Sequence, residues 1–340
     1  MLLLSCGRWL SHCPQARRSR SWILALSLAR ILALVLLLQL SAHAANRTWS
    51  NTGTDFNLGS SWGGTAPGVS DVALFSSARV TQPNLSSSLT IQELNFSATT
   101  SSGYDLTSSN TGIKLTLTNT GTGATSAINA ANTSGTNTID APIILGAAAA
   151  STQTFTQAGG GTLVVNGIIS STNTLTLSLA GAGIIQFAGS NTYGGATTIA
   201  SGTTVKISNA TALGTTALGT TVASGATLQL QGGITVGAEA LTVSGTGVAG
   251  QTGALVNVSG ANSYGGLLTL GAATTISSDS GTLDLTNAGT ITGATFGLTL
   301  TGAGSGSVSS IIGTTSGTLT KSGTGTWTDR KSTRLNSSHT

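Results

Sequence analysis

The sequence predicts an all-β protein, specifically a right-handed parallel β-helix (β-solenoid) with an N-terminal capping segment and a truncated C-terminus. Two observations favour this fold class. The phrase Gly-Ser-Asn-Thr-Tyr-Gly-Gly at 189–195 returns as Gly-Ala-Asn-Ser-Tyr-Gly-Gly at 260–266. Apolar pairs with one polar residue between them recur along the chain, separated by Gly-rich turn signals. Self-similarity at a fixed spacing is typical of stacked supersecondary units.

Residues 1–44 are expected to form a secretory signal peptide. Five arginines precede an apolar run at 31–38, and Ala42-His43-Ala44 supplies a small-x-small cleavage pattern. A membrane anchor is the alternative, because the apolar character extends back to Trp22. Arg30 interrupts that longer stretch, and the uninterrupted core falls short of the ~20 residues that a spanning helix needs. Cleavage and export are therefore favoured.

Residues 45–110 are expected to hold the N-terminal cap and the first strands. Trp49 and Trp62 lie in a segment whose composition differs from that of the rest of the chain. An array needs a cap, because its first coil otherwise exposes an open edge that templates aggregation. A carbohydrate-stacking platform built from the two tryptophans is the alternative.

Residues 111–328 are expected to form the β-solenoid repeats. Disorder usually requires low hydrophobicity and high net charge, and this segment has neither. Triplets such as Leu228-Gln229-Leu230 place aliphatic side chains on one face of a strand. We expect these eight side chains to point inward: Val205, Ile207, Leu228, Leu230, Leu268, Leu270, Leu283 and Leu285.

The spacing of the repeated phrase favours a solenoid over a sandwich or barrel. The interval of 71 residues divides into three coils of roughly 24 residues. About a dozen coils at ~4.8 Å each would accommodate the body of the chain. The abundant Asn, Ser and Thr are expected to form side-chain ladders that satisfy the turn backbone.

Residues 180–214 resemble the autotransporter-associated β-strand repeat, with Asn191-Thr192-Tyr193-Gly194 and a later Asn-Ala-Thr-Ala-Leu-Gly ending. The copy at 260–285 keeps the Asn, Tyr and Gly of that phrase but departs from the pattern at Leu267-Leu268. Residues 317–328 resemble the start of a further copy. The resemblance implies a passenger region of a Gram-negative surface protein, with a C-terminal barrel or sorting anchor further along the chain.

Residues 329–340 are expected to be an artefactual tail. They carry three cations after a body that is nearly free of them. Arg330 to Thr340 resembles a translated sequencing adapter, so we leave it out of the fold argument. The natural protein is then expected to continue past Thr328.

The composition of residues 45–328 excludes several kinds of chemistry. Five Lys or Arg and eight Asp or Glu give this body a net charge of −3, so the basic ends provide the only support for nucleic-acid binding. The body has no Cys and no His, which excludes disulfides, a thiolate or imidazole metal site and a histidine-based nucleophile.

Two short motifs suggest ligands but have simpler explanations. Residues 245–250 fit Gly-x-Gly-x-x-Gly, yet without a following helix they are expected to form a turn. Asp279 and Asp284 flank a turn and suggest calcium, but the nonapeptide calcium repeat is absent from the sequence, so solvent-exposed aspartates are favoured.

Glycoside hydrolysis would require two carboxylates about 5–9.5 Å apart. The candidates are Asp55, Asp71, Glu93, Asp105, Asp140, Glu239, Asp279 and Asp284. They are scattered singly, and their spacing does not place two on adjacent coils. Lys206, the cation of the matched repeat, has no acidic residue within thirty positions in sequence. We therefore assign no catalytic, cofactor-binding or metal-ligating residue.

The sequence thus predicts an exported bacterial surface β-solenoid with a structural, display or adhesive role, at the outer membrane or outside the cell. The expected partners are surface glycans or other cells, and no nucleic acid or cofactor. An adhesive role would need exposed aromatics, for which Tyr193 and Tyr264 are the candidates within the repeats; a stacked structural ladder is the favoured alternative. The competing interpretation is a secreted β-helix that binds or degrades polysaccharide.

Overall fold

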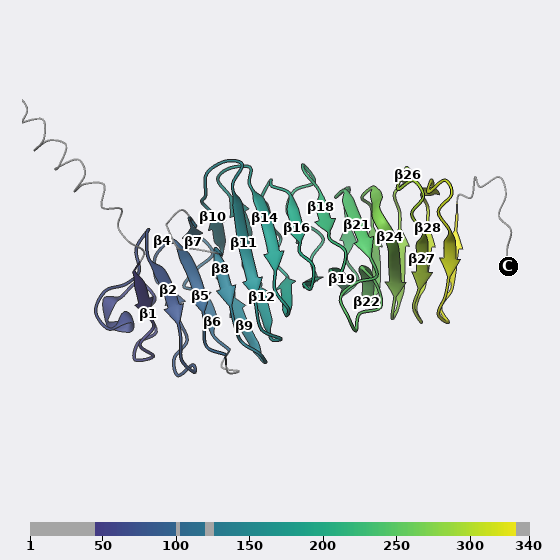
Figure 1. Cartoon of the computed structure of the whole chain (residues 1–340). Coiled ribbons are helices and arrows are strands. Elements are labelled where there is room, and N and C mark those ends of the chain that lie inside the picture. The colour runs from purple at the N-terminus through teal and green to yellow at the C-terminus, as the bar shows by residue number, and fades with distance from the viewer. Residues whose placement is uncertain (1–44, 100–102, 120–125, 331–340) are drawn as a thin grey trace, which may run out of the picture. The chain divides into compact units, whose positions relative to one another are not determined.

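The structure, a computed structural model, describes residues 45–99, 103–119 and 126–330. In these ranges the chain forms parallel strands stacked as a β-solenoid of about 12 turns (Figure 1). One short 3-10 helix, η1 (Gly59–Trp62), interrupts the strands near the start. The predicted signal peptide at 1–44 lies outside the described residues, as do residues 331–340 of the predicted tail.

Successive coils contribute strands to three columns, and every pairing is parallel between neighbouring coils. The first column comprises β1 (Asn46–Thr48), β2 (Val72–Phe75), β5 (Glu93–Phe96), β8 (Ile128–Ala130), β11 (Thr152–Gln157), β14 (Thr176–Ala180), β16 (Thr197–Ile199), β18 (Thr220–Val222), β21 (Leu241–Gly245), the start of β24 (Leu268–Ser278), β26 (Thr290–Ile291) and β29 (Ile311–Ile312).

The second column comprises β3 (Asn84–Leu85), β6 (Asp105–Ser108), β9 (Thr136–Ile139), β12 (Thr162–Val165), β15 (Ile184–Phe187), β17 (Thr204–Ile207), β19 (Thr227–Gln231), β22 (Leu255–Ser259), the end of β24, β27 (Leu298–Thr301) and β30 (Leu319–Lys321). The third column comprises a sheet of β4 (Leu89–Ile91), β7 (Leu115–Leu117), β10 (Ile143–Leu145) and β13 (Ile169–Ser171), and a sheet of β20 (Thr235–Val236), β23 (Ala261–Tyr264), β25 (Thr282–Leu285), β28 (Ser305–Val308) and β31 (Trp327–Asp329).

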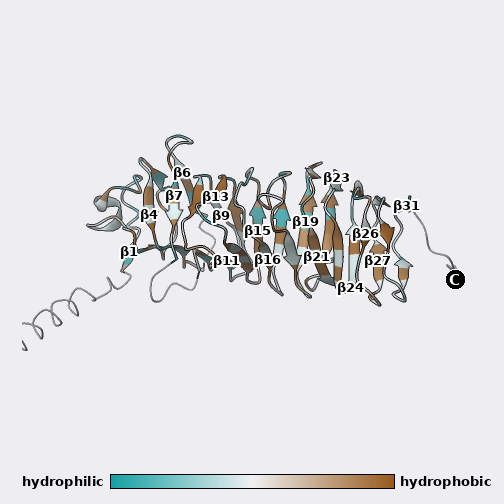
Figure 2. Cartoon of the chain, turned by 90° about the horizontal axis from the view of Figure 1, so that it is seen from above, coloured by the Kyte–Doolittle hydropathy of each residue, from teal (hydrophilic) through white to brown (hydrophobic). Residues whose placement is uncertain are grey.

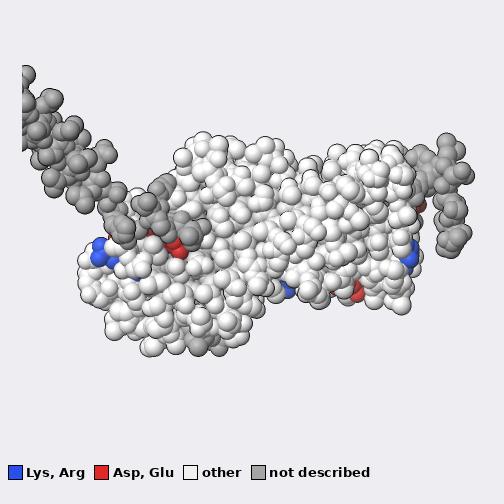
Figure 3. Space-filling model, in the orientation of Figure 1, with Lys and Arg blue, Asp and Glu red and all other residues white. Residues whose placement is uncertain are grey.

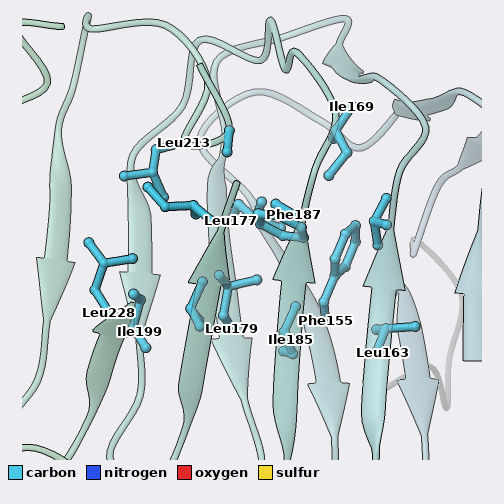
Figure 4. Close-up of a cluster of buried hydrophobic side chains, with 14 of the residues drawn as sticks. Phe155, Leu163, Ile169, Leu177, Leu179, Ile185, Phe187, Ile199, Leu213 and Leu228 are labelled. Carbon is cyan, nitrogen blue, oxygen red and sulfur yellow. The ribbon is translucent and has the colours of Figure 1, made fainter. Parts of the chain in front are cut away.

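The core lies between these columns and follows from the alternation of side chains along each strand. In β14 and β15 the buried residues alternate with half-buried ones, so one face of each strand points inward. Apolar bands recur from coil to coil (Figure 2). Figure 4 shows aromatic and aliphatic side chains from neighbouring coils meeting in the interior, including Phe155, Leu177 and Phe187.

The sequence predictions for the core are confirmed. All eight side chains expected to point inward are buried, with exposed fractions of at most 2%. The interval between the repeated phrases spans three coils, because Ile185 pairs with Val205, Val205 with Leu228 and Leu228 with Leu255. Coil length varies from one step to the next, and a register shift follows Leu230.

An aromatic cluster fills the N-terminal end of the described stack. The Trp49 and Trp62 rings meet edge to face at 5.0 Å, and Phe56 and Phe75 pack against both. Trp62 Nε1 donates to the Phe56 carbonyl at 2.7 Å. Both tryptophans are buried, so their rings build the first coils of the core. A sugar-stacking platform would need exposed ring faces.

Buried asparagines hold the corners of several coils. Asn191 Oδ1 accepts from the Ile169 N–H of the preceding coil at 2.8 Å, and its Nδ2 donates to the Ala212 carbonyl of the next coil. Asn262 Oδ1 accepts from the Ile234 N–H at 2.7 Å in the same way. These bonds satisfy backbone N–H and C=O groups that the strand pairing leaves without a partner. The Asn of the repeated phrase is therefore a structural residue that joins one coil to the next.

Candidate functional site

The carboxylates predicted from the sequence are mostly engaged in local contacts. Asp71 forms an ion pair with Arg47 at 3.1 Å. Asp55 accepts from the Ser86 hydroxyl at 2.8 Å. Glu93 is buried and accepts from Asn95 Nδ2 at 2.9 Å, and loss of solvent raises its pKa to about 7. These three carboxyl groups therefore each have a local partner within the first coils and do not converge on a common cleft.

One pair of carboxylates does meet, contrary to the expectation from spacing. Asp105 and Asp140 lie on adjacent coils, because Leu106 at the start of β6 pairs with Ile139 at the end of β9. Burial raises the pKa of Asp105, and the charge of Asp140 and a hydrogen bond between the two side chains raise it further. Asn166 Nδ2 donates to Asp140 at 2.7 Å. Asp140 therefore lies close enough for its charge to act on Asp105.

The remaining charged candidates have neutral partners. Asp279 accepts from the Thr252 hydroxyl at 2.9 Å, and Asp284 accepts from the Ser307 hydroxyl at 2.6 Å. Among the described residues, no group of three or more Asp, Glu, His or Cys side chains has a geometry that could hold a metal ion. Lys206 lies in register between Gln186 and Gln229 of the neighbouring coils.

Both tyrosines of the repeats lie in the interior. The exposed fraction of Tyr193 and of Tyr264 is 0%. Tyr193 Oη is 2.8 Å from Thr197 Oγ1. Burial raises the pKa of both phenols. The expected interior position of these tyrosines is therefore confirmed, and an aromatic binding face built from them is excluded. The two rings lie three coils apart, so they do not stack on each other.

The most regular surface feature is a column of hydroxyl groups on the outer face of the first column of strands. Each member lies in register with the next, so the side chains are spaced about 4.8 Å apart. We call this the hydroxyl ladder. Its seven members are Thr154, Ser178, Thr198, Thr221, Thr242, Thr269 and Thr292.

The hydroxyl ladder is open to solvent and uncharged. Each rung is itself half-buried or exposed, and all but Thr292 lie between two buried residues. Thr269 and Thr292 are 3.2 Å apart through their hydroxyls, whereas the hydroxyls of the other five rungs make no hydrogen bond to any described residue. None of the strands β11, β14, β16, β18, β21 and β24 contains a charged residue, and Figure 3 shows no gathering of charged atoms over them. The ladder therefore presents hydrogen-bonding groups without a local charge.

A small hollow borders the middle of the hydroxyl ladder. Thr221, Thr242 and Thr269 line one side of it, together with the exposed Leu218 and Leu267. Gly219 and Ala240, in register with Leu267, leave the space between the two leucines open. The hollow thus combines apolar side chains with a row of hydroxyls.

The hydroxyl ladder was not predicted from the sequence, although three of its seven rungs have a local signal. Ser178, Thr242 and Thr269 are each the middle residue of an apolar-polar-apolar triplet, such as Leu177-Ser178-Leu179 or Leu268-Thr269-Leu270, and the other four rungs are not. The period-two pattern shows that this residue points outward. It does not show which triplets are neighbours, because the first column and the second column carry the same pattern.

No protein-family model, curated protein or solved structure matches the chain. The similarity of residues 180–214 to the autotransporter-associated repeat therefore remains a prediction. In the part of the chain that the structure describes, no helix is long and apolar enough to cross a membrane.

Proposed function

We propose that this chain is an exported β-solenoid displayed on or released from the surface of a Gram-negative bacterium, where it has a structural or adhesive role without catalysis. The hydroxyl ladder is its contact surface, and neutral surface glycans are the partners. The observation that carries the proposal is the seven-rung register of uncharged, solvent-facing hydroxyls.

The chemistry of the ladder supports a neutral partner with a repeating structure. Hydroxyls donate and accept hydrogen bonds, as do the hydroxyls of a sugar chain. The adjacent Leu218 and Leu267 offer apolar contact beside them. Because the strands that carry the ladder have no charged residue, binding should depend little on ionic strength.

The test compares the binding of the full chain to an array of neutral and acidic polysaccharides with that of a double variant. Thr221→Val/Thr242→Val keeps the shape of both side chains and removes two adjacent hydroxyls. We expect wild-type binding to a neutral polysaccharide at both low and high salt. The double variant should lose about fivefold in affinity for each hydroxyl that it lacks.

The matched control is Thr90→Val/Thr116→Val, which removes two in-register hydroxyls from β4 and β7 in the third column. This variant should bind like the wild type. Equal losses in both double variants, or binding only to acidic polysaccharides, would contradict the assignment of the ladder. Surface exposure is tested separately by protease accessibility on intact cells that express the full chain.

A polysaccharide-degrading β-helix is the second candidate, and the observation that favours it is the position of Asp105 and Asp140 on adjacent coils. A carboxyl with a raised pKa, such as Asp105, is a potential general acid. Under this alternative, wild-type protein would release reducing ends from a polysaccharide that it binds, and Asp140→Asn would abolish the release. Under the display proposal neither protein releases reducing ends.

A further inference from the structure

A buried polar chain crosses the interior near the repeated phrases. It consists of Tyr193, Thr197, Thr220, Glu239 and Tyr264, whose exposed fractions are at most 4%. Thr197 and Thr220 are register partners on β16 and β18. Thr220 Oγ1 donates to Glu239 Oε1 at 2.8 Å. A carboxyl inside a core of Leu, Ile and Val is costly unless it is neutral or fully paired.

In the first copy of the phrase, the tyrosine has a partner on its own coil. Tyr193 Oη is 2.8 Å from Thr197 Oγ1, four residues later. The residue facing Gly195 from the preceding coil is Leu175, whose backbone leaves no room for a Cβ on that glycine. Here the tyrosine hydroxyl is satisfied, and its neighbour from the preceding coil is apolar.

In the second copy, both neighbouring positions differ. Leu268, four residues after Tyr264, replaces the threonine, so the hydroxyl partner is lost. Glu239 takes the place of the leucine, because its backbone lies against Gly266 as that of Leu175 lies against Gly195. The Tyr264 ring also lies close to Gly266. Compared with Tyr193 in the first copy, Tyr264 therefore has a carboxyl group as its neighbour instead of a threonine hydroxyl.

Two polar atoms mark where the missing interaction belongs. Tyr264 Oη and Glu239 Oε2 are both buried, and neither has a hydrogen-bond partner among the described residues. Burial is the main cause of the raised pKa of Tyr264 and of Tyr193. The negative charge of Glu239 raises both pKa values further. The carboxyl of Glu239 therefore lies near both rings and next to Thr220 in the polar chain.

We propose that Glu239, in its neutral form, replaces the lost threonine as the hydrogen-bond partner of Tyr264 and makes the stacking of these coils dependent on one proton. The neutral carboxyl accepts from Thr220 through Oε1. Under the proposal its Oε2 turns to bond Tyr264 Oη, which pairs the two atoms that otherwise have no partner. Loss of the proton to solvent leaves a negative charge in the interior. The stacking of the coils around the second copy is then more stable at low pH and less stable at high pH.

Among the residues that the structure describes, no charged side chain is placed to offset that charge. The titratable groups that face Glu239 are the phenols of Tyr193 and Tyr264. The strands packed around it, β16, β18, β21 and β24, contribute no Lys, Arg, Asp or Glu. Burial raises the pKa of Glu239, while the bond from Thr220 opposes this shift. The group therefore favours folding below the ordinary pKa of 4.5, and this contribution is lost as the pH rises through the raised value.

The test transplants the arrangement of one copy into the other. Glu239→Leu/Leu268→Thr gives the second copy the residues of the first, and Glu239→Gln keeps the hydrogen bonding without a charge. Chemical unfolding of the full chain from pH 4 to pH 9 is the measurement. For each pH unit between the ordinary and the raised pKa, the unfolding constant of the wild type should rise about tenfold relative to either variant.

The reverse transplant, Leu175→Glu/Thr197→Leu, should add a second pH-dependent loss of stability at the first copy. Parallel pH profiles for the wild type, Glu239→Gln and Glu239→Leu/Leu268→Thr would overturn the proposal, because Tyr264 and Thr220 would then satisfy the ionised carboxylate as well as the neutral one. Since Glu239→Gln preserves size and hydrogen bonding, the comparison holds even if the double variant fails to fold.

Discussion

At the scale of single residues, polar groups rather than apolar ones distinguish one coil from another. Asn191 and Asn262 perform the same task at equivalent corners, and each satisfies an N–H of the preceding coil. Replacing either leaves a buried donor unpaired, which typically costs about 1–3 kcal/mol. The repeated phrase is therefore explained by backbone hydrogen bonding, and its Tyr by interior packing.

Glu93 provides a pH-dependent prediction at the same scale. Its pKa of about 7 in the folded chain exceeds the ordinary 4.5, because burial disfavours the charged form. The stabilising contribution of its proton is complete below pH 4.5 and is lost as the pH rises through about 7. In Glu93→Gln this part of the pH dependence should disappear, as measured by urea unfolding. A difference between wild type and variant that stays constant from pH 4 to pH 9 would contradict the assignment.

At the scale of strands, period-two alternation identified which side chains enter the core. Leu228 and Leu230 illustrate this, since both are buried and both were placed inward from the sequence. The pairing of strands was harder to predict. Asp105 and Asp140 lie 35 positions apart in sequence yet on adjacent coils. A coil of unusual length separates them, so spacing alone placed them too far apart to meet.

Inward and outward positions on strands of the first column should respond differently to the introduction of a charge. Leu270→Lys buries an ammonium group among aliphatic side chains and should lower the free energy of unfolding by several kcal/mol. Thr221→Lys places the same group on the exposed face of β18, where water can solvate it, and should change the stability by less than about 0.5 kcal/mol. Thermal unfolding of both variants is the measurement. Equal melting temperatures for the two variants would be incompatible with the stacked core.

At the scale of the whole described stack, the register between coils positions each group of residues to which we assign a role. It aligns the hydroxyl ladder, brings Asp105 to Asp140 and places Glu239 beside the second tyrosine. The sequence predicted a solenoid and the three-coil interval between the repeated phrases. It could not predict the ladder, because coil lengths vary and Thr also occurs in many strands of the second and third columns. The register emerges only when all the strands are paired.

The most direct test of this register is a set of distances along the hydroxyl ladder, measured by double electron–electron resonance between spin labels. Labels at Thr154 and at Thr242, Thr269 or Thr292 are four, five and six rungs apart. At the spacing of neighbouring parallel strands, the labelled backbones should lie about 19, 24 and 29 Å apart. Measured distances that rise by one strand spacing per rung would support the ladder. Distances that show no regular increment would contradict the stacked register and the contact surface built on it.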